Sequence, residues 1–115
     1  MRALLATLLI LAAGPAMADP GADAFNDNCG ACHGLDAASS PVAPTLKGVV
    51  GRKIASLADF DYSAQLKAKG GVWTDAALDA FIQDPQGFAP GNGMPSGESD
   101  GAKRQAIIDY LKTVK

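Results

Sequence analysis

A single C-x-x-C-H motif, formed by Cys29, Cys32 and His33, places the strongest constraint on this chain. Two thiols at this spacing can form thioether bonds to the vinyl groups of a haem, and the adjacent imidazole can then bind the iron. A thioredoxin-like pair would need a βαβ pattern around the motif, and the sequence has none. Structural zinc needs about four ligands, whereas the chain has two cysteines and one histidine. The motif therefore predicts covalent haem attachment.

The composition limits the second axial ligand of such an iron. His33 is the only histidine, so a second imidazole is excluded. Met1 and Met17 lie in an N-terminal segment that we expect to be removed, and Met94 lies within residues 90–95, which are rich in turn formers. An isolated methionine is often a core residue, but a loop that presents a thioether suits the open side of a haem. The second ligand is therefore Met94, a lysine, or no durable ligand.

Residues 1–18 are typical of a secretory signal peptide. Arg2 precedes an almost continuous apolar run, and the A-M-A sequence at 16–18 has the pattern of a cleavage site. The run is far shorter than the roughly 20 residues that a membrane-spanning helix needs. We therefore expect a cleaved signal peptide at 1–18, one domain at 19–115, a periplasmic location and no stable membrane insertion.

The mature domain would carry a small negative charge. Without Arg2 it has nine Lys and Arg residues against twelve Asp and Glu residues, which gives a net charge near −3. This balance argues against a nucleic-acid partner and against binding to an anionic membrane surface. The core of so short a domain is marginal by itself, and a covalent haem would supply the missing apolar centre.

Helix signals predict an all-α domain with long ordered loops. The predicted helix starts are at Asp19-Pro20, Ser63, Thr74, and Ser99 or Asp100. Asp84-Pro85 is expected to end the third helix, and residues 88–101 are expected to form a loop. Residues 39–51 contain prolines and glycines that exclude long elements. Loops of this length are unusual in a small domain, but they are expected around a prosthetic group.

Several segments, in order and at matching spacing, make the chain resemble the class I cytochromes c of the mitochondrial and bacterial c2-like branch. These segments are the C-x-x-C-H motif, Pro44 to Arg52, Phe60 to Ser63, Trp73, Phe81 to Met94, and Ile107 to Lys112. The resemblance covers essentially all of residues 19–115. It implies the class I cytochrome c fold, in which several helices and ordered loops wrap around one covalent haem c.

The resemblance also implies ligand roles. Cys29 and Cys32 would anchor the haem. His33 would be the proximal iron ligand and Met94 the distal ligand. The carbonyl group of Pro44 would accept a hydrogen bond from the imidazole of His33 and so fix its orientation.

Further residues would surround the haem if the resemblance holds. Arg52, Tyr62 and Trp73 would hydrogen-bond a buried propionate, although without the family Tyr62 and Trp73 would be taken as ordinary core aromatics. Asn92 replaces the usual threonine before the ligand and could still donate a hydrogen bond. The terminal helices would cross, and the residues expected at that crossing are Gly21, Phe25, Ile107 and Tyr110.

The sequence departs from the family pattern at several positions. Phe81 stands where a tyrosine commonly reaches the methionine sulfur, so that hydrogen bond is expected to be absent. Ser96 falls where an aromatic residue often covers the haem face. Gln86, Gly87 and Gly93 replace lysines of the mitochondrial docking ring. We therefore expect partner docking to differ from the mitochondrial kind.

The sequence favours a soluble, periplasmic, monomeric one-electron carrier that docks transiently with a redox donor and acceptor and is not an enzyme. The alternative is a dedicated cytochrome subunit that accepts electrons from a periplasmic dehydrogenase, which the changed docking positions motivate. An enzyme or gas sensor with labile Met94 ligation has less support. The sequence offers no second histidine and no obvious general acid near the ligand loop.

Overall fold

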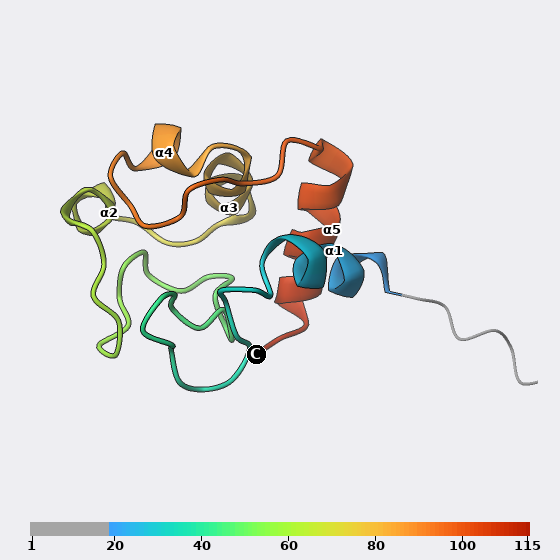
Figure 1. Cartoon of the computed structure of the whole chain (residues 1–115), viewed down its shortest axis with the longest axis horizontal. Coiled ribbons are helices and arrows are strands. Elements are labelled where there is room, and N and C mark those ends of the chain that lie inside the picture. The colour runs from blue at the N-terminus through green and yellow to red at the C-terminus, as the bar shows by residue number, and fades with distance from the viewer. Residues whose placement is uncertain (1–18) are drawn as a thin grey trace, which may run out of the picture.

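The computed structural model describes residues 19–115, so the predicted signal peptide lies outside the described residues. The helices within this range are α1 (Pro20–Asn28), α2 (Ala64–Lys69), α3 (Asp75–Gln83), α4 (Pro85–Phe88) and α5 (Gly101–Lys112) (Figure 1). Residues 19–115 form no β-strand, and their one β-type pairing is an isolated antiparallel bridge between Lys53 and Val72. The predicted all-α class is confirmed. Among the described helices, none has the length and apolar character needed to cross a membrane.

The predicted helix starts are confirmed by side-chain caps. Asp19 accepts a hydrogen bond from the backbone N–H of Gly21 at 2.8 Å, at the start of α1. Ser63 and Thr74 cap α2 and α3 in the same way, and the last helix is capped by Asp100. Each cap satisfies backbone donors that the first turn of a helix leaves unpaired.

The short helix α4 was not predicted. Asp84 caps it by accepting a hydrogen bond from the Gly87 N–H at 2.9 Å, and Pro85 occupies its first turn. The same Asp-Pro pair also ends α3, which is the role that the sequence analysis gave it. The interruption therefore turns the chain into a second helix.

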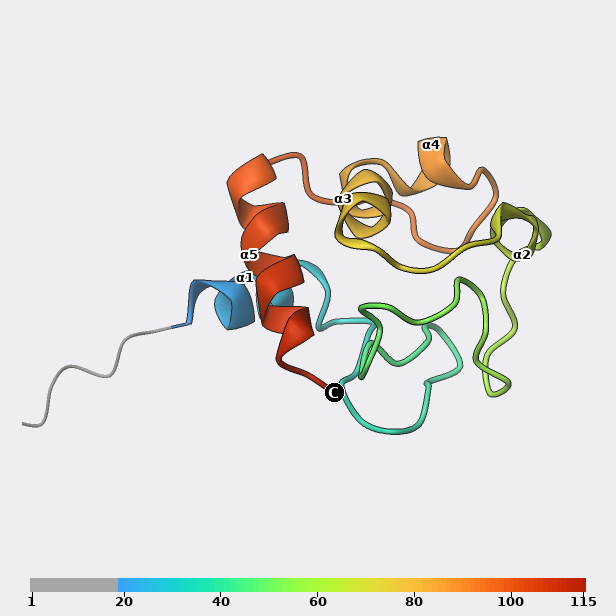
Figure 2. The same ribbon diagram turned by 180° about the vertical axis from the view of Figure 1, so that it is seen from behind.

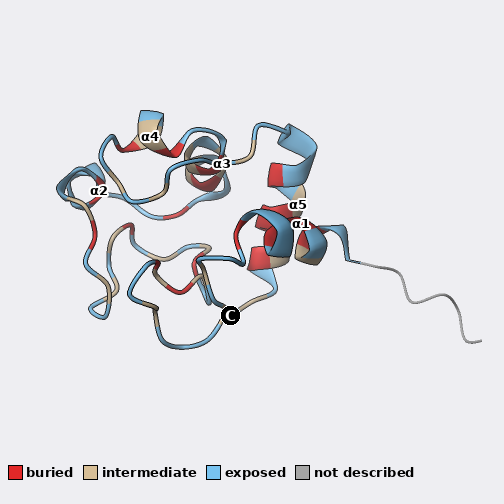
Figure 3. Ribbon diagram, viewed as in Figure 1, coloured by how far each residue is buried: buried red, intermediate tan, exposed pale blue. Residues whose placement is uncertain are grey.

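Helices α1 and α5 cross closely because Gly21 has no side chain. A Cβ atom built at Gly21 would lie 2.4 Å from the carbonyl oxygen of Ala106 on α5. One turn further along α1, the ring of Phe25 lies 5.8 Å from the ring of Tyr110. Ile107 is completely buried, and Figure 3 shows buried residues on both helices where they cross. The predicted terminal helix pair is confirmed.

Arg104 joins α5 to α3 and to the segment before α5. Its Nε donates to the Asp79 carboxylate at 2.8 Å, and its Nη1 donates to the carbonyl oxygens of Glu98 and Ser99 at 3.1 and 2.8 Å. The arginine is buried, and such a charge is tolerated because it is paired and hydrogen-bonded. Near the other end of α5, Lys112 pairs with Asp75 at 2.6 Å.

Helices α2, α3 and α4 lie in one half of the molecule and the loops of residues 34–60 in the other, in both Figure 1 and Figure 2. A short backbone pairing joins the halves. Gly51 N–H donates to the Trp73 carbonyl at 2.9 Å, Trp73 N–H to the Arg52 carbonyl at 2.8 Å, and Ile54 N–H to the Gly71 carbonyl at 2.9 Å. This pairing brings Arg52 next to Trp73.

Candidate haem-binding site

The C-x-x-C-H motif forms a turn that continues directly from α1. The backbone N–H of Cys29 donates to the Phe25 carbonyl at 2.7 Å, and the N–H of His33 donates to the Cys29 carbonyl at 2.9 Å. Cys29 is buried and Cys32 is exposed. Burial raises the pKa of the Cys29 thiol to about 11, so the thiol is protonated at neutral pH. One turn therefore presents both thiols and the imidazole.

His33 is oriented by the carbonyl group of Pro44. Nδ1 of His33 lies 2.9 Å from that oxygen. Because a carbonyl can only accept, Nδ1 carries the proton and Nε2 is left with a free lone pair. Burial lowers the pKa of His33, against a smaller opposite effect of the hydrogen bond to Pro44. The imidazole is therefore neutral at pH 7, as a metal ligand must be.

The loop that carries Pro44 is fixed by its own hydrogen bonds. The buried hydroxyl of Thr45 donates to the Asp36 carbonyl, and Leu46 N–H donates to the Gly34 carbonyl at 3.0 Å. Ser39 binds Asp59 twice, through its N–H and its hydroxyl, each at 2.8 Å. These contacts hold the segment after the motif in one conformation and so fix the position of the Pro44 carbonyl.

Arg52 has a buried donor without a protein partner. Its Nη2 donates to the Thr45 carbonyl at 2.9 Å and its Nη1 to the Lys47 carbonyl at 3.2 Å. Among residues 19–115, Nε of Arg52 is the one buried side-chain nitrogen or oxygen that lacks a hydrogen-bond partner. Leaving a buried donor unpaired costs on the order of 1–3 kcal/mol, and more when the group is charged. An anionic acceptor such as a haem propionate would satisfy it, so this donor fits the expected cofactor.

Tyr62 and Trp73 are both buried beside this region. The Tyr62 hydroxyl accepts a hydrogen bond from the Leu57 N–H at 3.4 Å, which leaves its proton available for another acceptor. Tyr62 also influences the pKa of Arg52, which burial lowers and Tyr62 raises. The Trp73 ring packs on Phe81 and Phe88, with centroids 5.2 and 5.7 Å apart. The three predicted propionate donors therefore lie in one region.

Met94 is half-buried in the loop between α4 and α5, and side chains hold its backbone on both sides. Its N–H donates to Oδ1 of Asn92 at 2.7 Å, and its carbonyl oxygen accepts from Nε2 of Gln86 at 2.8 Å. The role of Gln86 was missed, because the sequence analysis considered that position only as a lost docking lysine. A glutamine in a loop-proximal helix carries no sequence signal for such contacts.

Asn92 donates its hydrogen bonds to the backbone near the ligand loop. Its Nδ2 donates to the carbonyl oxygens of Pro85 and Ala89, both at 2.7 Å. A side-chain amide has two N–H donors, and both are used on the backbone. Asn92 therefore holds the ligand loop in place and has no donor left for the methionine sulfur.

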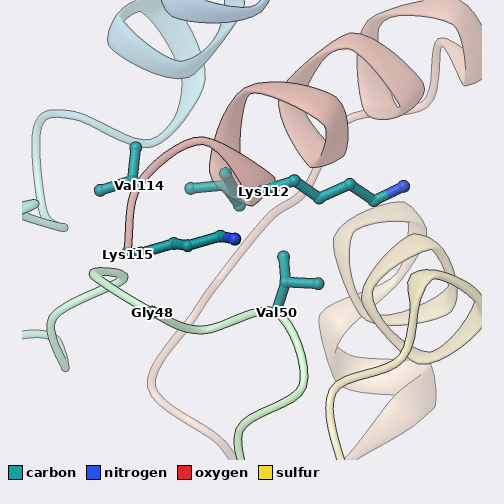
Figure 4. Close-up of a pocket in the computed structure, with 6 residues that line it drawn as sticks. Gly48, Val50, Lys112, Val114 and Lys115 are labelled. Carbon is teal, nitrogen blue, oxygen red and sulfur yellow. The ribbon is translucent and has the colours of Figure 1, made fainter.

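The described domain also has a hollow of about 310 Å³ at the C-terminal end of α5, drawn in Figure 4. Its lining residues are Gly48, Val50, Leu111, Lys112, Val114 and Lys115. None of the predicted haem-site residues is among them. The Gly48 N–H donates to the Val114 carbonyl at 2.8 Å beside it. The hollow is thus a feature of C-terminal packing.

The cytochrome c family profile matches residues 18–115, which include the whole described domain. The chain belongs to the cytochrome c family. Cytochrome c2 iso-1 of Magnetospirillum molischianum is 40% identical over 101 residues, which cover 85% of this chain and 100% of that protein. Cytochrome c 2.1 of Caenorhabditis briggsae is 35% identical over 95 residues, 82% of this chain and 85% of that protein.

Solved cytochromes share the fold. Cytochrome cH from Methylobacterium extorquens superimposes with a TM-score of 0.75 at 43% identity and covers 82% of this chain and 95% of that one. The ferricytochrome c2 from Rhodopseudomonas palustris gives a TM-score of 0.73 at 28% identity, with coverages of 84% and 96%. The predicted class I cytochrome c fold is confirmed, and this cytochrome carries one haem c attached through Cys29 and Cys32.

Proposed function

We propose that this cytochrome is a periplasmic one-electron carrier in which His33 and Met94 ligate the haem iron. The main supporting observation is that hydrogen bonds within the protein position both candidate ligands. Pro44 orients the His33 side chain, and Gln86 and Asn92 hold the Met94 backbone. The two candidate ligands also come from separate segments, since His33 follows α1 and Met94 lies between α4 and α5. When bound, the haem supplies a reversible ferric/ferrous couple.

The surroundings favour transfer of an electron over chemistry on a substrate. If His33 and Met94 both bind the iron, they would leave no position open for a substrate, and an imidazole and a thioether together would raise the reduction potential. The core that includes Cys29, Tyr62 and Trp73 is apolar, and an apolar shell disfavours the additional charge of the ferric centre. The chain contributes position, ligation and low dielectric.

A periplasmic location is supported by two observations. The segment at 1–18 has the pattern of a secretory signal, and cytochromes c2 of Magnetospirillum species are among the similar proteins. Cleavage after Ala18 would release a domain that begins at the cap residue of α1, Asp19. We expect the mature protein to be a monomer.

Docking with redox partners is proposed to be transient and not driven by a cationic face. Residues 20–46 and 70–102, which include the C-x-x-C-H motif and the ligand loop, contain no lysine or arginine. Electrostatic steering needs complementary charge on the two partners. A strongly acidic partner would therefore gain no steering from these segments.

Optical spectra of the oxidised protein test the ligation. We expect a weak near-infrared charge-transfer band from sulfur to iron. Met94→Ala should abolish this band and let the reduced protein bind carbon monoxide. Ile108→Ala, which truncates a buried residue of α5, is the control for general destabilisation and should keep the band. A wild-type protein without the band would point to lysine ligation or an open iron and would overturn the proposal.

The second candidate function is a cytochrome subunit held by a periplasmic dehydrogenase. The observation in its favour is that positions 86, 87 and 93 hold glutamine and two glycines. The lysines that would form a docking ring for several separate redox partners are therefore absent from these positions. Co-purification of a larger enzyme with the untagged cytochrome at physiological salt would favour this role. A monomeric cytochrome that exchanges electrons with separate donor and acceptor proteins would favour the free carrier.

A further inference from the structure

We propose that Gln86 is a positioning residue that restrains the release of Met94 from the haem iron. This inference rests on the proposed ligation by Met94 and goes beyond it, because Gln86 itself would not touch the metal. The side chain of Gln86 reaches from α4 across the ligand loop. It thereby connects the start of that loop to the ligand residue.

Three hydrogen bonds carry the proposal. Nε2 of Gln86 donates to the carbonyl oxygens of Asn92 and Met94 at 2.9 and 2.8 Å, and Oε1 accepts from the Gly91 N–H at 3.0 Å. The side chain is partly buried. The geometry settles the orientation of the amide, because a reversed amide would face its oxygen toward two carbonyl oxygens and its NH₂ toward an N–H.

The two amides of the loop act on the same backbone. Gln86 holds the Met94 carbonyl, and Asn92 holds the Met94 N–H at 2.7 Å. Gln86 also binds the Asn92 carbonyl, so the two side chains form one connected network. Loss of Gln86 would remove one backbone hydrogen bond from each of Gly91, Asn92 and Met94.

The base of this network is itself fixed. Pro85 is buried, and Asp84 caps the helix to which Gln86 belongs. Lys69 on α2 donates to the Phe88 carbonyl at 3.0 Å and lies 4.2 Å above the Phe88 ring. A side chain that extends from a fixed element restricts the segment it binds, whereas one on a mobile element would move with it.

The consequence concerns the competition between Met94 and other ligands for the iron. A flexible loop spreads its methionine over many positions and so lowers its effective concentration at the metal. A loop held at both backbone groups of the ligand residue keeps the thioether near one position. Gln86 would therefore oppose displacement of Met94 by an exogenous ligand, without changing the identity of the axial ligands.

The test is titration of the oxidised holoprotein with imidazole, followed by the loss of the sulfur-to-iron band. We expect Gln86→Ala to keep the band without imidazole but to bind imidazole about tenfold more tightly, a change of about 1.4 kcal/mol. Hydrogen exchange of the Gly91 and Met94 amides should accelerate in the same variant. Gln86→Glu keeps the acceptor for Gly91 but loses both donors, and it should not restore the wild-type affinity.

Matched controls separate positioning from general stability. Gln83→Ala removes an exposed glutamine from the end of α3 and should leave the imidazole affinity unchanged. Asp79→Ala removes the partner of Arg104, so it should lower unfolding stability while leaving the affinity near the wild-type value. Wild-type affinity in Gln86→Ala would overturn the inference, as would an equal gain in Asp79→Ala. Absence of the band from the wild type would instead overturn ligation by Met94.

Discussion

Arg52 donates to the Thr45 carbonyl at 2.9 Å with one terminal nitrogen, while its Nε is buried with no acceptor from the described chain. One side chain thus braces the loop next to Pro44 and also keeps a charged donor free. Burial lowers the pKa of Arg52, but the group stays protonated at neutral pH. An anionic group of the cofactor, as expected from the sequence, would satisfy such a donor.

Replacement of Arg52 should therefore destabilise the holoprotein. Arg52→Met is expected to lower the free energy of unfolding by about 2 kcal/mol, because a hydrogen bond to a charged group and the contacts to the Thr45 and Lys47 carbonyls are lost. Chemical denaturation followed by the haem absorption measures it. Lys53→Met, at the exposed neighbour, is the control and should change stability by less than about 0.5 kcal/mol. Equal losses in both variants would contradict the role of Arg52.

Gly21 should be intolerant of any side chain. Gly21→Ala would place a Cβ atom 2.4 Å from a backbone oxygen of α5, so the two helices must separate, at a cost of about 1–3 kcal/mol. The control is Gly101→Ala at the start of α5, where the nearest atom is Nη2 of Arg104 at 3.4 Å, an ordinary van der Waals contact. Thermal unfolding should show a loss for the first variant and a neutral or positive change for the second. The reverse order would disprove the close crossing.

Asp59 should contribute to the decrease in the free energy of unfolding at acidic pH. Its pKa is lowered by the two hydrogen bonds from Ser39. A carboxylate whose pKa is lower in the folded than in the unfolded protein stabilises the fold at pH values above its unfolded pKa, which is near 3.9. This stabilisation is lost as the pH falls through the pKa of the folded state. Asp59→Asn should flatten the decline in stability below about pH 4.

The size of this effect will be small, because Asp59 is fully exposed and solvent screens it. Denaturation midpoints measured from neutral pH into the acid range would reveal it. Asp27→Asn on the exposed side of α1 is the matched control, since Asp27 makes no side-chain contact with another loop among the described hydrogen bonds. An unchanged acid slope in Asp59→Asn would show that the link to Ser39 does not form in solution.

Electron transfer to an acidic partner should respond weakly to salt. With no lysine or arginine in residues 20–46 or 70–102, the rate with an acidic-surfaced mitochondrial-type oxidase should be low and should stay level or rise with ionic strength. Gly93→Lys adds a cation at an exposed position with open space around it. This variant should gain rate at low salt and lose it as salt is added. A fast wild-type rate that collapses with salt would indicate a cationic face built from other lysines.

The helix starts could be predicted because caps depend on neighbours in sequence. Asp19, Ser63, Thr74 and Asp100 each bind a backbone N–H two or three residues ahead. The same reasoning could have found α4, since Asp84-Pro85 repeats the Asp-Pro signal of α1. That pair was interpreted only as a stop, whereas it both ends one helix and caps the next.

Other contacts could not be predicted, because they depend on tertiary placement. Arg104 lies on the last helix as a buried charge, and its carboxylate partner Asp79 is 25 positions earlier in the chain. Gln86 binds three groups of a loop whose path is set by packing. The sequence predicts the residues that would hold the haem from their chemistry. The side chains that hold those residues have no comparable signature.

The crossing of α1 and α5 has a consequence for the order of biogenesis. These are the first and last helices of residues 19–115, so their interface cannot form until α5 has been synthesised. Until then Cys29, which is buried in the finished fold beside this interface, is accessible at the end of an unpaired helix. The thiol of Cys29 is therefore most accessible in a chain whose α1 and α5 have not yet paired.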